Sequence, residues 1–168
     1  MNNNNLTNDE KFFLNKQVIN NSEEVKLDIN NIVSNISPDN EILLLGENTH
    51  GTKEFYTHRS FISKYMIENM GYRVILLEAE WPDIIRVNEY IQDYGFDKSA
   101  NEAMGNITKF PIWMWKNSVT YELIEWLKVF NKNSKDNMVY VLGIDCQQFL
   151  KSIKFILDYL KTHNHPFY

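Results

Sequence analysis

Three short apolar runs, each followed by a polar turn, constrain the fold of this chain more than any other feature. The runs cover residues 42–45, about 74–77 and about 138–144. Unbroken runs of this length are typical of strands that are buried on both faces of a parallel sheet. Since ligands of such sheets bind beyond the carboxyl ends of the strands, we expect the polar residues after the runs to meet in one crevice.

The segments between these runs have the residue spacing of amphipathic helices. Apolar residues recur at helical intervals over 25–36, 53–70, 82–91, 118–130 and 149–160. Ser99 and Glu102 form a capping box for one further short helix. This order predicts an α/β fold, with a mostly parallel sheet of about three strands flanked by helices. So small a sheet leaves apolar edges open, and we expect additional sequence or another subunit to complete it.

Composition narrows the class of protein. The 168 residues are 43% hydrophobic and 14% aromatic, which indicates one globular domain. A net charge of −5 offers no basic surface to nucleic acid, and no apolar run is long enough to cross a bilayer. A single cysteine, Cys146, and an N-terminus without signal-peptide features favour a cytoplasmic protein. Residues 1–20 are polar and expected to be poorly ordered, so the predicted domain covers 21–168.

The turn after the first run contains the strongest candidate for chemistry, His50. An imidazole titrates near neutral pH and can take a proton from water, although a lone histidine in a turn is more often an ordinary surface residue. A carboxylate behind the ring would fix its tautomer and stabilise its charged form. We expect Glu78 to have this role, with Glu47 as the second choice. Glu47 has an alternative role as an acid near the start of the helix at 53–70.

Two further carboxylates and a guanidinium are expected in the same crevice. Glu78 and Glu80 are two residues apart, so in a regular strand they project from the same face. Arg59 lies within the apolar stripe of its helix, where it is expected to pair with a carboxylate or to bind a substrate oxygen. Asp145 ends the third run and either forms the floor of the crevice or caps a turn. We assign Glu80 and Asp145 to substrate binding.

Other residues that carry chemistry in some proteins are read as structural here. Cys146 has no basic neighbour to activate it. The tryptophans of the 110–117 segment and Trp126 are expected to belong to the core. His163 and His165 have no second pair of ligands at the spacing of a metal site. The chain contains neither a phosphate-binding glycine loop nor a Gly-x-Ser-x-Gly elbow, and we expect no metal and no other cofactor.

Two segments together resemble the erythromycin esterase family. They are residues 46–59, GENTHGTKEFYTHR, and residues 77–83, LEAEWPD, and shorter matches follow at 110–117 and 143–145. The resemblance implies an α/β hydrolase that opens macrolide lactones, and so inactivates an antibiotic, without a metal. It also implies that the residue matching His50 activates water. The positions matching Glu47, Glu78 and Arg59 then support the histidine.

The resemblance leaves the activity of this chain open. Family members are considerably longer, and a second functional histidine lies in a part that has no counterpart here. The chain is therefore expected to be the N-terminal portion of an incomplete erythromycin-esterase-like domain. The first hypothesis is a hydrolase of lactones or carboxylic esters. The second is a truncated, non-catalytic remnant or a half-domain that needs a complementing chain or self-association. The third is a small metal- or haem-binding module. Some family members are described by succinoglycan biosynthesis, so the family does not fix the substrate.

Overall fold

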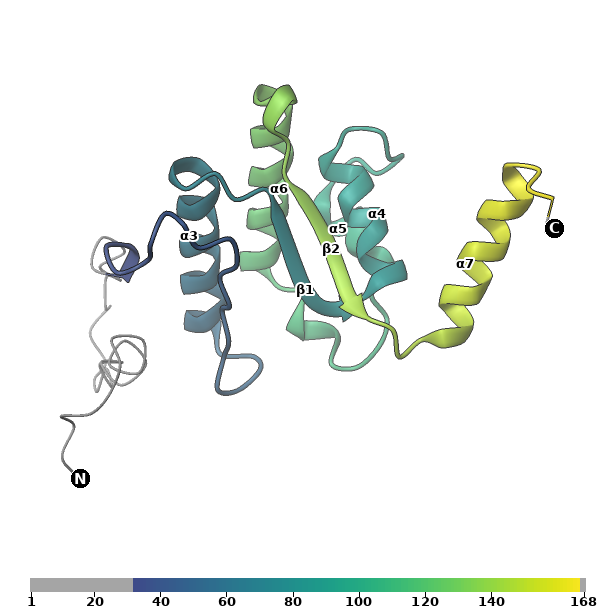
Figure 1. Ribbon diagram of the computed structural model, residues 1–168. Helices are drawn as coiled ribbons and strands as arrows, with labels where there is room; N and C mark the ends of the chain where they lie inside the picture. Colours follow the sequence, from purple (N-terminus) through teal and green to yellow (C-terminus); the bar gives the residue numbers. More distant parts are fainter. Residues whose placement is uncertain (1–31, 167–168) are drawn as a thin grey trace. The chain divides into compact units, whose positions relative to one another are not determined.

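The computed structural model describes residues 32–166, and Figure 1 shows how their helices and strands are arranged. The chain divides into two compact units between Leu43 and Leu44, which are described separately. In the first unit residues 32–33 are helical, and Val33 and Ile36 are buried. The expectation for residues 1–20 and most of the predicted helix at 25–36 lie outside the described residues.

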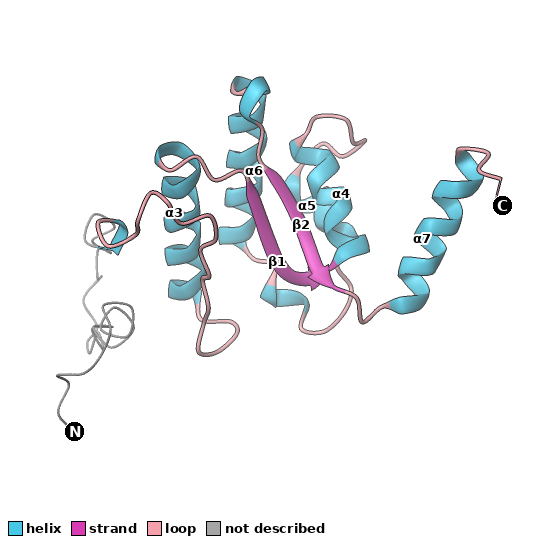
Figure 2. Ribbon diagram, viewed as in Figure 1, coloured by secondary structure: helices cyan, strands magenta, loops and turns pink. Residues whose placement is uncertain are grey.

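The second unit alternates helices with strands, as Figure 2 shows. Its elements are α3 (Lys53–Asn69), β1 (Val74–Glu80), α4 (Trp81–Ile91), α5 (Ala100–Ala103), η2 (Met104–Asn106), η3 (Ile112–Met114), α6 (Ser118–Asn133), η4 (Lys135–Asn137), β2 (Tyr140–Asp145) and α7 (Phe149–Thr162). One half of the predicted capping box is present, because the Ser99 side chain accepts a hydrogen bond from the backbone N–H of Glu102. The Glu102 side chain accepts from the backbone N–H of Lys98, one residue before the expected partner. Asn117 caps α6 as Ser99 caps α5, through the N–H of Thr120. The α/β class predicted from the sequence is confirmed.

The sheet in the described part of the chain has two strands rather than the predicted three. β1 and β2 are parallel, and Val74 is paired with Tyr140 at the start of the register. The predicted strand at 42–45 is wrong, because these residues form no strand in the structure. Ile42 and Leu44 are 78% and 88% exposed. A strand needs a neighbouring strand for its backbone hydrogen bonds, and an apolar run without such a neighbour remains extended but unpaired.

One face of the sheet carries the core of the second unit. α4 packs against β2 and α6 packs against α4, and Figure 1 shows both helices behind the two strands. Val141 projects from β2 into this layer. It belongs to the same buried apolar cluster as Ile84 and Val87 of α4 and Leu127 of α6, and all four are at most 1% exposed. Burial of such side chains contributes roughly 1.5–3 kcal/mol each, so this three-element contact fixes the position of β1 and β2.

The other face of the sheet is apolar and uncovered in the described residues. Leu76 on β1 is 58% exposed, and Ile144 on β2 is 60% exposed. Val74 and Tyr140, which are paired at the start of the sheet, are exposed as well. Parallel sheets are ordinarily covered on both faces, whereas the described residues cover one face of this sheet.

An irregularity near the end of β1 separates the two strand glutamates. The register between β1 and β2 shifts between Leu77 and Glu80. Gly143 permits the close approach there, because a Cβ atom at this position would lie 2.5 Å from the backbone oxygen of Ala79. Alternation is lost, so Glu78 is exposed while Glu80 is buried. The expectation that the two side chains project into one place from a regular strand is therefore not met.

Candidate functional site

His50, Glu47 and Arg59 form a cluster at the start of α3. The Nδ1 atom of His50 lies 2.6 Å from Oε1 of Glu47. On the other side of the carboxylate, Nη2 of Arg59 lies 2.8 Å from Oε2 of Glu47, an ion pair without the angles of a hydrogen bond. The Glu47 side chain is 6% exposed, whereas that of His50 is 43% exposed. A buried carboxylate thus contacts an accessible imidazole and a half-buried guanidinium.

The position of this cluster follows from local sequence. Glu47 and His50 are three residues apart in the turn that precedes α3, so a short loop brings them together. Thr52 is the N-cap residue of α3, and Arg59 lies on the second turn of the helix. Of the two carboxylates expected to orient His50, it is Glu47, the second choice, that makes the contact. Because a carboxylate only accepts hydrogen bonds, Nδ1 donates in this contact, and in the neutral ring Nε2 is then the acceptor.

Two aromatic rings hold the guanidinium of Arg59. Its Cζ atom lies 4.7 Å from the centre of the Tyr56 ring and 5.3 Å from the centre of the Trp115 ring. The two rings meet edge to face, with centres 6.5 Å apart and planes at 86°. Tyr56 also accepts a hydrogen bond of 3.2 Å from the backbone N–H of Gly51. Sequence analysis did not single out Tyr56, although it lies three residues before Arg59 on the same helix, a spacing that places the two side by side.

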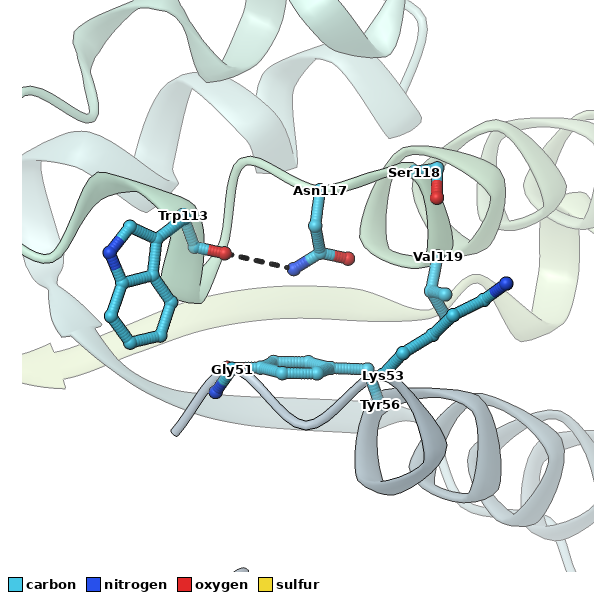
Figure 3. A pocket seen from close by; sticks show the side chains of 7 residues that line it. All are labelled: Gly51, Lys53, Tyr56, Trp113, Asn117, Ser118 and Val119. Carbon is cyan, nitrogen blue, oxygen red and sulfur yellow. Dashed lines mark hydrogen bonds between the residues drawn. The ribbon is translucent and has the colours of Figure 1, made fainter. Parts of the chain in front are cut away.

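An open pocket of about 480 Å³ adjoins this cluster. Figure 3 shows its lining, which consists of Gly51, Lys53, Tyr56, Trp113, Asn117, Ser118 and Val119. Gly51 has φ +88°, and a Cβ atom here would lie 2.8 Å from the Trp113 ring. Only glycine fits this conformation and this contact without strain. The Asn117 amide donates to the carbonyl oxygens of Trp113 and Met114, so it holds the pocket wall rather than facing a ligand.

Glu78 reaches the cluster through its backbone. The indole Nε1–H of Trp115 donates a hydrogen bond of 2.9 Å to the carbonyl oxygen of Glu78. The Glu78 side chain is exposed, and no ion pair joins it to another residue of the described part. The structure therefore brings the end of β1 next to Arg59 by way of a tryptophan.

Glu80 belongs to a second polar cluster. Its Oε1 atom accepts from the Lys109 ammonium at 2.9 Å, and its Oε2 atom accepts from the backbone N–H of Gln148 at 3.0 Å. Burial opposes ionisation of this carboxyl, but the Gln148 N–H and Lys109 outweigh it and hold the pKa of Glu80 below its usual value. Arg59 was the partner expected for the strand glutamates. It pairs with Glu47 instead, and Lys109 is the cation that pairs with Glu80.

Further members of the second cluster were not anticipated from the sequence. Asp83, which is 2% exposed, forms an ion pair with Lys151 of α7. The Lys151 ammonium also donates to the carbonyl oxygen of Asn106. Asp145 is half-buried at the end of β2, in register with Glu80. The sequence placed Asp83 one residue after a proline at a helix start, but nothing in it identified a lysine 68 residues later as its partner.

The hydrogen bonds and ion pairs of the structure join the candidate residues into two groups. Glu47, His50 and Arg59 lie together, with the Glu78 backbone attached through Trp115. Glu80 lies in the second cluster, in register with Asp145. The first group combines an accessible imidazole with a buried acid and a cation, which is the arrangement of a general base. In the second group the carboxylates of Glu80 and Asp83 are paired with lysines.

The described residues contain neither a metal-binding cluster nor a membrane-spanning helix. Among residues 32–166, no three His, Cys, Asp or Glu side chains lie close enough to hold a metal ion. None of the described helices is both long and apolar enough to span a membrane.

Comparison with known proteins identifies relatives of this chain. The curated erythromycin esterase type II of Escherichia coli is 26% identical over 128 residues, which cover 74% of this chain and 29% of the relative. A solved structure of a succinoglycan biosynthesis protein is 26% identical, with a TM-score of 0.55, and the match covers 71% of this chain and 29% of that one. A Bacillus cereus protein of known structure is 26% identical, with a TM-score of 0.49, over 61% and 23% of the two chains.

The chain spans less than a third of the length of the curated relative. A match over 74% of this chain necessarily includes residues 46–59, which hold the Glu47–His50–Arg59 cluster. The sequence model of the family described as erythromycin esterase matches residues 67–168, including Glu78 and the second cluster. That match covers more than half of the chain, which therefore belongs to the erythromycin esterase family.

Proposed function

We propose that this chain carries the general-base centre of a hydrolase that acts on a lactone or carboxylic ester. The observation that carries the proposal is the contact of Nδ1 of His50 with the buried carboxylate of Glu47, at 2.6 Å. Membership of the erythromycin esterase family supports hydrolase chemistry in general terms. The relative from Escherichia coli supports a macrolide lactone as one substrate, and the chain matches 29% of that protein.

In the proposed reaction, Nε2 of His50 takes a proton from water as the water oxygen attacks the carbonyl carbon. The Glu47 carboxylate stabilises the imidazolium that forms. The Arg59 guanidinium lies 2.8 Å from the second oxygen of Glu47 and holds this carboxylate in place behind the imidazole. A positioned general base contributes roughly 10²–10⁴ in rate. Collapse of the tetrahedral intermediate breaks the ester bond, and the proton held by His50 passes to the departing alkoxide.

Substrate would approach from the exposed side of His50. The adjoining pocket has aromatic walls, Tyr56 and Trp113, which suit an apolar part of an ester. Glu78, exposed at the end of β1, stays among the proposed catalytic residues as a carboxylate that faces solvent. Asp145 and Glu80 stay proposed substrate-binding residues. Asp145 is the better placed of the two, because both oxygens of Glu80 are already engaged.

The test is hydrolysis of erythromycin and of a p-nitrophenyl ester by the wild-type chain and by His50→Ala. We expect His50→Ala to lose roughly 10²–10⁴ of the rate. Glu47→Gln keeps the size of the side chain but removes the charge that stabilises the imidazolium, so a smaller loss is expected. His163→Ala is the control, because His163 stacks on Tyr159 at the end of α7 and is no part of the cluster. Unchanged turnover in His50→Ala would remove this residue from the mechanism.

A second candidate function is favoured by the uncovered face of the sheet. We propose as the alternative that the chain is a non-catalytic half-domain, completed by polypeptide that corresponds to the rest of the family fold. Leu76 and Ile144 are exposed on a parallel sheet, which ordinarily has both faces covered. The chain also matches only 29% of its relatives. A wild-type chain that has no hydrolytic activity and self-associates through this face would favour this alternative.

A further inference from the structure

Trp115 lies in the segment 110–117 before α6 and has no part in the mechanism proposed above. Trp115 is 9% exposed and was expected to be an ordinary core side chain. It has two polar contacts with different segments of the chain, the Arg59 guanidinium over its ring and the Glu78 carbonyl oxygen at its indole N–H. We propose that Trp115 is a positioning residue that fixes the Glu47–His50–Arg59 cluster to the end of β1.

Arg59 needs such a residue because its contact with Glu47 does not orient it. The ion pair is short, 2.8 Å, but Nη2 of Arg59 and Oε2 of Glu47 have no hydrogen-bond partner within residues 32–166. A long side chain held only by charge retains freedom to rotate and loses it at a cost in entropy. The rings of Tyr56 and Trp115 meet at 86° and form a corner around the guanidinium. The faces of these rings therefore orient the cation.

The indole N–H connects this corner to a different part of the chain. Glu78 is 37 residues before Trp115, and the 2.9 Å hydrogen bond ties its carbonyl oxygen to the ring that lies beside Arg59. Tyr56 makes the corresponding contact on the other side, where its hydroxyl oxygen accepts from the N–H of Gly51, next to His50. Two aromatic residues thus join the histidine turn, the arginine and the end of β1 into one unit.

The two contacts of Trp115 can be separated by substitution. Trp115→Phe keeps an aromatic face for Arg59 but removes the N–H that bonds to Glu78. Trp115→Leu removes both. Trp126→Leu is the matched control, because Trp126 on α6 is half-buried, stacks on Phe130 and has the Lys64 ammonium 5.4 Å from its ring centre. The control loses a tryptophan and a cation contact outside the site.

The primary readout does not depend on activity. Modification of Arg59 by phenylglyoxal, followed by mass spectrometry, measures how firmly the guanidinium is held. We expect Trp115→Leu to accelerate it roughly 2- to 30-fold, which is the range of a cation–π contact. Trp115→Phe and Trp126→Leu should stay near the wild-type rate. The ¹⁵N shifts of the His50 ring give a second signature, because the Nδ1–H tautomer depends on Glu47 being in place. In Trp115→Leu we expect a mixture of tautomers.

The positioning role of Trp115 rests on the proposed function only where an effect on the rate of hydrolysis is expected. If the wild-type chain hydrolyses ester, both Trp115 variants should lower kcat more than they raise KM, since they misplace the base without touching the pocket. Unchanged Arg59 modification and unchanged His50 tautomer in folded Trp115→Leu would overturn the positioning role, whether or not the chain is active. If Trp115→Leu does not fold, the wild-type spectrum decides: absence of nuclear Overhauser contacts between the Trp115 ring and Arg59 would overturn it equally.

Discussion

At the scale of single residues, the two glutamates at the end of β1 have different surroundings although they are two residues apart. Glu80 is buried and accepts hydrogen bonds from Lys109 and from the Gln148 backbone. Glu78 is exposed at the same strand end. The register shift after Leu77 causes the difference, because it breaks the alternation that would place both side chains alike.

The contacts of Glu80 predict that its contribution to stability depends on pH. The pKa of Glu80 is lowered below its ordinary value of 4.5, so the folded state favours the charged form. Its contribution to the free energy of unfolding is therefore complete above that value and is lost as the pH falls through the lowered pKa. We expect Glu80→Gln to be less stable than wild type near neutral pH and to lose less stability on acidification. Urea unfolding at several pH values measures both effects.

Glu78→Gln is the control for this prediction, because it makes the same chemical change at the exposed glutamate. Because the Glu78 side chain is exposed, this variant should lose little stability near neutral pH, where Glu80→Gln is expected to lose more. Parallel acid profiles for wild type and Glu80→Gln would show that Lys109 and Gln148 do not hold the carboxylate as described.

At the scale of elements, α7 differs from the other long helices of the second unit in how it is attached. None of its residues is fully buried, and its apolar residues Leu150, Ile156 and Leu157 are exposed. Polar contacts tie its first turns to the rest: Lys151 pairs with Asp83, and the N–H of Gln148 bonds to Glu80. The Phe155 ring of α7 also contacts the Trp81 ring of α4, with the ring centres 4.9 Å apart.

Loss of the Lys151 contact is predicted to loosen α7 selectively. Lys151→Met leaves the buried Asp83 carboxylate without its ammonium partner. Breaking a fully buried pair costs about 3–5 kcal/mol, and because Lys151 is 34% exposed we expect a smaller cost, on the order of 1–2 kcal/mol. Amide hydrogen exchange should accelerate in residues 149–162 and remain unchanged in α6. Lys154→Met, an exposed lysine of the same helix, is the control, and equal exchange in the two variants would refute the anchoring role of Lys151.

At the scale of the whole molecule, the sheet of the second unit has a helical layer on one face only within the described residues. α4 and α6 cover one face of β1 and β2, and the opposite face leaves Leu76 and Ile144 open. A patch of aliphatic side chains on a sheet is a surface for other polypeptide or a site of aggregation. The uncovered face is therefore the physical basis of the alternative function.

We predict that the isolated chain self-associates or binds a hydrophobic dye through this face. The double variant Leu76→Ser and Ile144→Ser should reduce both in size-exclusion and dye-fluorescence measurements. Val129→Ser, which removes an exposed apolar residue from α6, should not. Co-expression with the part of the Escherichia coli relative that this chain does not match should yield a complex with the wild type and less with the double variant. A monodisperse monomer that binds neither dye nor this segment would refute the prediction.

The sequence by itself determined the elements and the local contacts. Periodicity of three to four residues predicted the helices that include α3, α4 and α6, and it did so because backbone hydrogen bonds and side-chain faces within a helix are set by near neighbours. The proximity of Glu47 and His50 also comes from their spacing of three residues. The family resemblance seen in the sequence is confirmed by the comparisons.

Only the tertiary structure decided which distant residues meet. It left 42–45 unpaired, although the composition of this run favours a strand, because a strand forms only where a neighbouring strand accepts its hydrogen bonds. It paired Arg59 with Glu47 and Glu80 with Lys109, a choice that residue type does not make, since any cation suits any carboxylate. It also gave Trp115, which is in the core as expected, a second role as the link between Arg59 and Glu78, because that role exists only once three separate segments pack together.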